Sequence, residues 1–275
     1  MSDAVPGPQL HATVTARLRS AGSVFAEDEA ALLIEAAPEA AELAGMVRRR
    51  VAGEPLEVIL GWVWFYGRRI AVDAGVFVPR RRSEFLARTA IGRAGPQDVV
   101  LDVCCGTGAL GAVIADSVPG VQVHATDLHP AAVQCARGNL APFAAQVHQG
   151  DLFEPLPSRL RGGVDLIVVN APYVPTAHIA LMPPEAREHE PRMALDGGPD
   201  GTQVHRRVAA EAPAWLAPGG RLLIETSSAQ ANRTAQAMAA SGLDPQVLHC
   251  AELQATVVAG TAPELSAAEG LGPGR

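Results

Sequence analysis

The tetrapeptide Asn170-Ala171-Pro172-Tyr173 is the part of the sequence best suited to chemistry. It directly follows the apolar, β-branched run 164–169, which is typical of a buried strand. The Asn170 side-chain oxygen and the Ala171 backbone carbonyl could accept the two N–H groups of a planar amide or amine, and Pro172 restricts the backbone before it. Tyr173 could stack on the flat group and exclude water. We call these four residues the nitrogen clamp, because the pattern predicts that they hold a weak nitrogen nucleophile in line with an activated methyl group.

A glycine turn earlier in the chain predicts the site of the methyl donor. The buried run 99–103 leads into Gly106 and Gly108, whose missing side chains let a ligand approach the backbone. The same letters match the dinucleotide fingerprint, but Asp102 before the glycines would repel a pyrophosphate and attract the ammonium of a methionine moiety. Cys104 is expected to pack beside the ligand as a small apolar group. The turn therefore favours S-adenosylmethionine over a nicotinamide dinucleotide.

Two further aspartates stand at the expected ends of the next strands. Asp127, followed by Leu128, could accept both hydroxyls of a ribose, although an N-cap before a helix is an alternative role. Asp151 could take the adenine amino group while Leu152 covers the ring, and a turn or capping role fits Asp151 about as well. Together these residues predict an adenosine site.

Composition limits the classes of partner. The chain has 275 residues, 48% hydrophobic residues and a net charge of -7, so no overall positive field would hold a nucleic-acid backbone. The sequence has neither a signal peptide nor an apolar run long enough for a membrane, and we expect a cytoplasmic protein. The four cysteines lack the spacing of a zinc site or a disulfide framework, so no metal is expected.

These residues must be positioned by a doubly wound α/β fold. From residue 99 onward, strands are expected at 99–103, 121–126, 146–149, 166–169, 221–225, 245–248 and 255–259, alternating with helices at 110–117, 131–140, 202–216 and 229–241. Residues 10–51 predict two or three short helices, and the aromatic stretch to residue 72 predicts a hairpin. We therefore expect a helical domain at 1–52, a hairpin linker at 53–75, a catalytic domain at 76–262 and a disordered tail at 263–275.

Several segments together resemble the release-factor glutamine N5-methyltransferase family, a group of class I methyltransferases with an Asn-Pro-Pro-Tyr motif. Gly53-Glu54-Pro55 with the aromatic run is similar to that family's interdomain hairpin, and Val78-Pro79-Arg80 with Glu84 is similar to its Ile-Pro-Arg-Pro-x-Thr-Glu segment. The stretch that begins with Glu190 and Pro191 and ends at Gly201 is close to a signature of the same family. The resemblance implies a class I fold, with a mostly parallel sheet of seven strands and a small N-terminal helical domain.

The resemblance also implies roles. The cofactor is S-adenosylmethionine, Asp102, Gly106 and Gly108 line its methionine end, and the clamp holds the side-chain amide of a glutamine in a protein such as a release factor. Arg80 and Glu84 would help to close the site, Glu190 and Pro191 would lie on the substrate side, and the N-terminal helices would contact the protein substrate. We expect a monomer.

Three departures mark the chain as a divergent member or a paralogue. Ala171 replaces a proline, Arg81-Arg82 replace a Pro-acidic pair, and Cys104 replaces a glycine. An adenine N6-methyltransferase would suit the same clamp, but no basic groove is evident. The two arginine triplets, Arg48-Arg49-Arg50 and Arg80-Arg81-Arg82, are interpreted as contacts to an acidic partner or as solvated surface. A cofactor-binding module without catalysis is the remaining alternative, which the intact Asn170 and Tyr173 disfavour.

Overall fold

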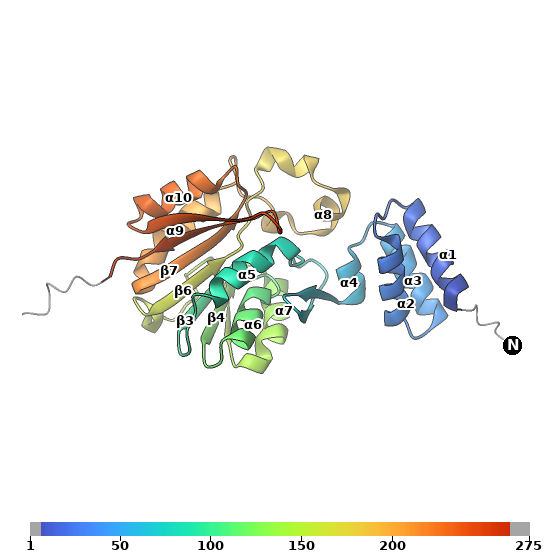
Figure 1. The fold of residues 1–275 in the computed structure, drawn as a ribbon, viewed down its shortest axis with the longest axis horizontal. Helices are drawn as coiled ribbons and strands as arrows, with labels where there is room; N and C mark the ends of the chain where they lie inside the picture. The colour runs from blue at the N-terminus through green and yellow to red at the C-terminus, as the bar shows by residue number, and fades with distance from the viewer. Residues whose placement is uncertain (1–6, 265–275) are drawn as a thin grey trace, which may run out of the picture.

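The structure, a computed structural model, describes residues 7–264 and consists of a helical bundle joined to an α/β body (Figure 1). The bundle is formed by α1 (Gly7–Ser20), α2 (Ala26–Ala36) and α3 (Ala40–Val51). The short helix α4 (Leu56–Leu60) and the antiparallel hairpin of β1 (Trp62–Phe65) and β2 (Arg68–Ala71) lead from it to the body. In the described residues no helix is long and apolar enough to cross a membrane.

The body is built on one seven-stranded sheet. Its strands are β3 (Val99–Val103), β4 (Gln122–Asp127), β5 (Gln146–Gln149), β6 (Val164–Val169), β7 (Leu216–Thr226), β8 (Asp244–Cys250) and β9 (Ala255–Thr261). The spatial order is β5-β4-β3-β6-β7-β9-β8, and β5 through β7 are parallel while β9 pairs antiparallel with both β7 and β8. The order reverses beside β3, which is the switch point where such sheets bind ligands.

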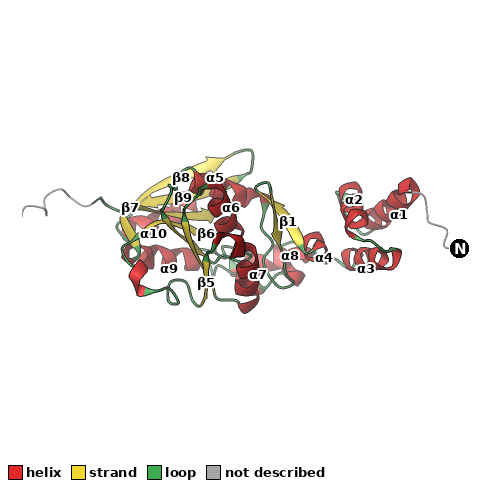
Figure 2. Ribbon diagram, turned by 90° about the horizontal axis from the view of Figure 1, so that it is seen from below, coloured by secondary structure: helices red, strands yellow, loops and turns green. Residues whose placement is uncertain are grey.

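Alternation along the strands places one hydrophobic core on each face of the sheet. Val100, Leu166 and Leu223 face α5 (Glu84–Ile91), α6 (Ala109–Ser117) and α7 (Pro130–Leu140). Their neighbours Leu101 and Ile167 face the layer of α9 (Gln203–Glu211) and α10 (Ala231–Ala240). Helices therefore cover both faces, as the ribbon views show (Figures 1 and 2), and the expected class I architecture is confirmed.

The helical bundle has a core of its own and is held to the body by charge. Leu18, Leu33 and Val47 are among the buried residues that pack together with Ile59 of α4. Arg50, near the end of α3, forms an ion pair with the buried Glu29 at 2.8 Å and reaches Glu185 of α8 (Pro184–His189) at 3.3 Å. Helix α8 thus lies between the bundle and the body (Figure 1).

Most expected elements are present, and the differences have local causes. The helix expected at 202–216 ends as α9 at Glu211, because Pro213 has no amide hydrogen to extend the helix, and a 3-10 turn at 212–214 leads directly into β7. Helices α4, α5 and α8 were not expected from the sequence. The expected disordered tail, 263–275, lies outside the described residues except for residues 263 and 264.

Candidate active site

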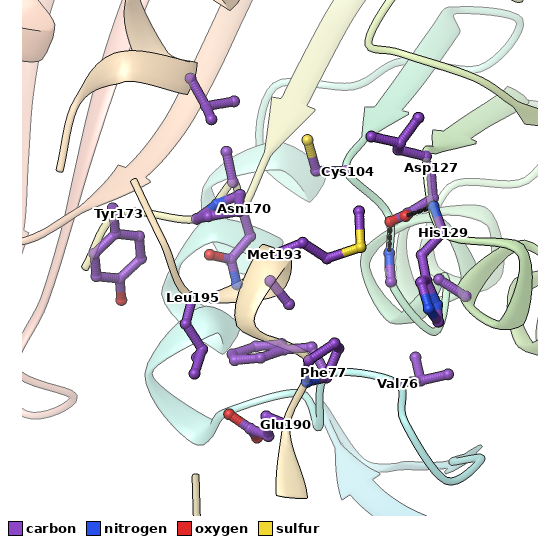
Figure 3. A pocket seen from close by; sticks show the side chains of 18 of the residues that line it. Val76, Phe77, Cys104, Asp127, His129, Asn170, Tyr173, Glu190, Met193 and Leu195 are labelled. Carbon is purple, nitrogen blue, oxygen red and sulfur yellow. Dashed lines mark hydrogen bonds between the residues drawn. The ribbon is translucent and has the colours of Figure 1, made fainter. Parts of the chain in front are cut away.

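A cavity of about 500 Å³ opens at the carboxyl ends of β3, β4 and β6. Three loops close it: the segment after the hairpin, the clamp loop after β6, and the segment from α8 to Leu195. Figure 3 shows Asn170 and Cys104 near its centre, with Asp127 on one side and Phe77, Glu190 and Leu195 on another. The volume is in the range of pockets that bind small organic ligands, about 300–1,000 Å³.

The nitrogen clamp lines this cavity with two free acceptors. The Asn170 amide donates from Nδ2 to the Ser83 hydroxyl at 3.1 Å, which leaves its Oδ1 for another donor. In the part of the chain that the structure describes, no hydrogen bond ends at the Asn170 Oδ1 or at the Ala171 carbonyl. Both atoms are therefore available to the two N–H groups of a planar nitrogen.

Tyr173 is held in place by charged neighbours. Its hydroxyl donates to Glu225 Oε1 at 3.2 Å, and the Arg82 guanidinium lies 5.7 Å from the centre of its ring. Burial and the nearby carboxylate raise the pKa of the Tyr173 hydroxyl, so it stays protonated and acts as a donor. Tyr173 is thus a fixed wall of the cavity.

The segment 190–201 supports the clamp loop from behind. Val174 and Asp196 form a parallel bridge, and the Gly197 amide donates to the Val174 carbonyl. A Cβ on Gly197 would come within 2.7 Å of the Tyr173 Cα, and one on Gly201 (φ +74°) would overlap the Tyr173 carbonyl oxygen. The glycines of this segment therefore allow close backbone packing against Tyr173.

On the cofactor side, Asp127 closes β4 and is tied to the backbone. Its Oδ2 accepts the Gly106 amide at 2.9 Å and its Oδ1 accepts the His129 amide at 2.8 Å. Burial raises the pKa of Asp127, while these two amides lower it. A carboxylate offers about four acceptor positions, so both oxygens can still receive ribose hydroxyls. The adjacent Leu128 is exposed and lines the cavity rim.

Asp151 and Leu152 lie at the end of the cavity beyond β5. Asp151 Oδ2 is bound by Arg207 of α9 at 2.8 Å, which leaves Oδ1 for a ligand. Leu152 is buried and adopts a φ of +46°. These positions suit an exocyclic amine and the face of a base.

Not every predicted residue reaches the cavity. Asp102 is fully buried behind the glycine turn, where its Oδ2 accepts the Gly111 amide at 2.9 Å. Gly108 begins α6 and packs against Ala136, and Glu84 accepts the Tyr66 amide at 3.0 Å. The structure therefore places these three predicted site residues outside the cavity lining, where they support the turn, the helix and the hairpin.

Cys104 lies in the cavity wall, as expected, but in a strained conformation. Its φ of +58° falls in the left-handed region, where glycine has no steric penalty. Burial raises the pKa of its thiol, so the sulfur is an unreactive, neutral group. The backbone geometry explains why a glycine suits this position.

The acceptor side of the cavity is mainly apolar and is closed by an ion pair between a partly exposed arginine and a buried glutamate. Arg80 binds Glu190, whose side chain is only 2% exposed, and so joins the segment after the hairpin to the one after α8. Burial raises the pKa of Glu190 and Arg80 lowers it. Phe77, Met193 and other apolar side chains line the space next to this pair (Figure 3).

Sequence reasoning missed several residues of this site. His129 was not predicted as a site residue, yet it lines the cavity and its buried Nδ1 has no partner among the described residues. Arg82 was interpreted as surface or as a contact to an acidic partner. Its Nε lies 3.5 Å from Oε1 of Glu225, a buried residue that was not predicted as part of the site. Arg49, Arg50 and Arg80 also bind carboxylates of this chain. The carboxylates that these arginines bind therefore belong to the chain itself, while the side chain of Arg82 remains 47% exposed, as the surface interpretation predicts.

The cavity fits S-adenosylmethionine. Gly106 lines it and an added Cβ would meet no protein atom within 4 Å, so a ligand can approach this backbone. The aspartates at the ends of two strands offer acceptors to a ribose and an amine. The residues present therefore match an adenosine with an attached amino acid.

Comparisons with known proteins agree with this geometry. A family model described as "Methyltransferase small domain" matches residues 69–182. A release factor glutamine methyltransferase of Geobacter sulfurreducens is 40% identical over 195 residues, covering 70% of this chain and 68% of the relative. A 4-amino-L-phenylalanine/4-methylamino-L-phenylalanine methyltransferase of Streptomyces pristinaespiralis is 38% identical over 191 residues, 67% of this chain and 65% of the relative. A methyltransferase structure from Pyrococcus furiosus has a TM-score of 0.55 at 17% identity, and the match covers 72% of this chain and 91% of that structure's chain.

Proposed function

The chain belongs to the release factor glutamine methyltransferase family, and from this premise we propose that it transfers the methyl group of S-adenosylmethionine to the side-chain amide of a glutamine in a protein, a release factor. The observation that carries the proposal is the pair of free acceptors, Asn170 Oδ1 and the Ala171 carbonyl, at the carboxyl end of β6. Their number matches the two N–H groups of a primary amide.

The cofactor supplies an electrophilic methyl on a sulfonium, and the chain supplies position. Asp127 and Asp151 would hold the adenosine, with Leu128, Leu152, Cys104 and Gly106 around it. The clamp would hold the glutamine amide so that its nitrogen forms a bond to the methyl carbon as the carbon–sulfur bond breaks. The amide proton then leaves to water. Orientation of this kind contributes about 7–11 kcal/mol in favourable cases, so no strong base is required.

We propose that the described helices of the N-terminal segment, within residues 1–52, receive the protein substrate. They stand apart from the sheet (Figure 2), and α8, which carries cavity-lining residues, is joined to them through Arg50 and Glu185. Residues 53–75 would serve as linker and residues 76–262 as the methyltransferase domain. We also propose that the protein works in the cytoplasm, where a release factor acts. We propose a monomer, because one copy supplies the clamp and the cofactor-side residues that line the cavity.

Two other acceptors are chemically possible for the clamp. An aromatic amine is the acceptor in the name of one relative, and the apolar wall formed by Phe77 and Met193 would suit a ring. Adenine would need a basic path for nucleic acid, yet four of the six arginines in the two triplets, Arg49, Arg50, Arg80 and Arg82, are bound to carboxylates of the chain. Glutamine in a protein is the acceptor that family membership supports.

The test is methyl transfer from labelled S-adenosylmethionine to purified release factor, 4-amino-L-phenylalanine and DNA, with peptide mass mapping of the protein product. We expect label on one glutamine of the release factor. Label found only on the small amine or only on DNA would overturn the assignment of glutamine as the methyl acceptor.

Asn170→Ala tests the clamp itself. Loss of one oriented polar group at a reacting centre lowers kcat by about 100-fold or more, while binding of S-adenosylhomocysteine, measured by calorimetry, stays within a few fold. Asn232→Ala, an exposed change on α10, is the matched control. Equal activity in the Asn170 and Asn232 variants would contradict the proposed mechanism.

A further inference from the structure

Glu225 lies behind the nitrogen clamp and touches its tyrosine. It is next to the last residue of β7, and its side chain is only 2% exposed. Its Oε1 accepts the Tyr173 hydroxyl at 3.2 Å and lies 3.5 Å from Arg82 Nε. Its Oε2 is buried with no hydrogen-bond partner among residues 7–264. Burial of a carboxylate without a full set of hydrogen bonds costs free energy, which suggests a functional role toward its neighbours.

Ser83 links the same carboxylate to the clamp asparagine. The Ser83 hydroxyl is buried and accepts the Asn170 Nδ2 at 3.1 Å. Ser83 lies beside Glu225, because it directly follows Arg82, whose Nε is 3.5 Å from Glu225 Oε1. In agreement with this position, the Ser83 hydroxyl is one of the groups that lower the pKa of the carboxylate. Since the Ser83 oxygen accepts from Asn170, its own proton is free to point to Glu225. The carboxylate therefore accepts a hydrogen bond from Tyr173 and lies beside the serine that holds Asn170.

We propose that Glu225 is a positioning residue that, acting through Ser83, fixes the Asn170 amide with its oxygen toward the acceptor nitrogen. A primary amide turned by 180° fills almost the same space but presents an NH2 group, which cannot accept a proton. An ionised Glu225 can only accept, so it directs the Ser83 proton away from Asn170. Ser83 is then left as an acceptor, and only the Nδ2 side of Asn170 can face it. The inference rests on the proposed transfer to an amide nitrogen.

The charge state of Glu225 depends on a small set of neighbours. Burial raises its pKa, and Ser83, Arg82 and Tyr173 lower it. His205 of α9 lies on the other side, 6.3 Å from the Tyr173 ring, and is neutral near pH 7 because burial lowers its pKa to about 4. When pH falls through the raised pKa of Glu225, the carboxyl group gains a proton and can donate to Ser83. The constraint on Asn170 is then lost.

Kinetics test the inference. We expect Glu225→Gln and Ser83→Ala each to lower kcat by about 10-fold or more, as the loss of about one oriented hydrogen bond predicts, with the KM for S-adenosylmethionine changed less than about threefold. Ser83→Thr, which keeps the hydroxyl, should recover most of the rate lost in Ser83→Ala. The matched control is Ser241→Ala, whose hydroxyl donates to the Ala237 carbonyl in α10. Unchanged kcat in both Glu225→Gln and Ser83→Ala would overturn the proposal.

A second measurement does not require activity. The sequence has three asparagines, so protein labelled with ¹⁵N-asparagine gives three pairs of side-chain amide signals, and the Asn170 pair is identified by its absence in Asn170→Asp. We expect this pair to shift with pH in the wild type and to lose that dependence in Glu225→Gln and Ser83→Ala. If the pair responds to pH equally in all three proteins, the proposal is wrong. If the wild type transfers no methyl group, the proposed function fails, and the signals still decide the inference.

Discussion

Gly201→Ala should damage the site from a position outside the cavity lining. Gly201 has a φ of +74°, and alanine in this region costs about 1–2 kcal/mol. The new Cβ would also overlap Gln230 Nε2 and the Tyr173 carbonyl oxygen. Gln230 donates to that carbonyl at 2.7 Å and to the Asp200 carbonyl at 3.1 Å, so two hydrogen bonds worth about 0.5–1.5 kcal/mol each are strained or lost. We expect a loss of about 3 kcal/mol in the free energy of unfolding.

Urea unfolding followed by tryptophan fluorescence measures this loss. With an m-value of about 2–3 kcal/mol/M, the midpoint should fall by about 1 M. The matched control is Gly67→Ala in the β1–β2 turn, where φ is +75° but an added Cβ meets no atom within 4 Å. The control should show only the backbone cost, and kcat should fall in Gly201→Ala alone because Tyr173 moves. If the free energy of unfolding falls equally in the two variants, the packing of Gly201 against the clamp loop does not contribute to stability, and the prediction is wrong.

Three further changes test the cofactor side. Cys104→Gly removes the steric cost of a side chain at a left-handed φ of +58°. The free energy of unfolding in the same urea assay should therefore rise by about 1 kcal/mol. Asp127→Asn should weaken S-adenosylhomocysteine binding by about 10-fold or more in calorimetry, because the amide replaces one acceptor oxygen by a donor. Asp102 has its pKa raised to about 7 by burial, so the native state binds a proton that the unfolded state releases, and its contribution to stability falls as pH rises from about 4 to 7. Asp102→Asn should therefore gain stability relative to the wild type over that interval, and a constant difference would contradict the assignment.

The fold could be predicted because each strand of the body carries a strong local signal. The runs 99–103 and 146–149 coincide with β3 and β5. The first is marked in the sequence by a nearly continuous apolar run, and the second by alternation of apolar and polar residues. Helix α5 was missed because its signal is short and follows the arginine run Arg80–Arg82. Helix α8 has only six residues and begins at a proline, so its identity depends on contacts with the bundle and the cavity.

The site was predictable only where strand ends fix the residue. Asn170 and Asp127 follow β6 and β4 directly, and the sheet alone brings them to one edge. Phe77 comes from a loop, and Arg82 and Met193 come from short 3-10 turns. The paths of these segments depend on tertiary contacts, so no local pattern marks the three residues. Asp102 shows the opposite case, because its place before the glycines suggested a ligand contact, whereas its buried carboxylate is tied to the helix that follows.

The departures from the family pattern are accommodated by backbone and charge. Ala171 still provides its carbonyl, since that acceptor does not depend on the side chain. Arg82 lies over the Tyr173 ring and near Glu225, so its positive charge lowers the pKa of a carboxylate that burial raises. A neutral or acidic residue in place of Arg82 would leave Glu225 easier to protonate. The arginine therefore helps to keep ionised the carboxylate that faces both clamp side chains.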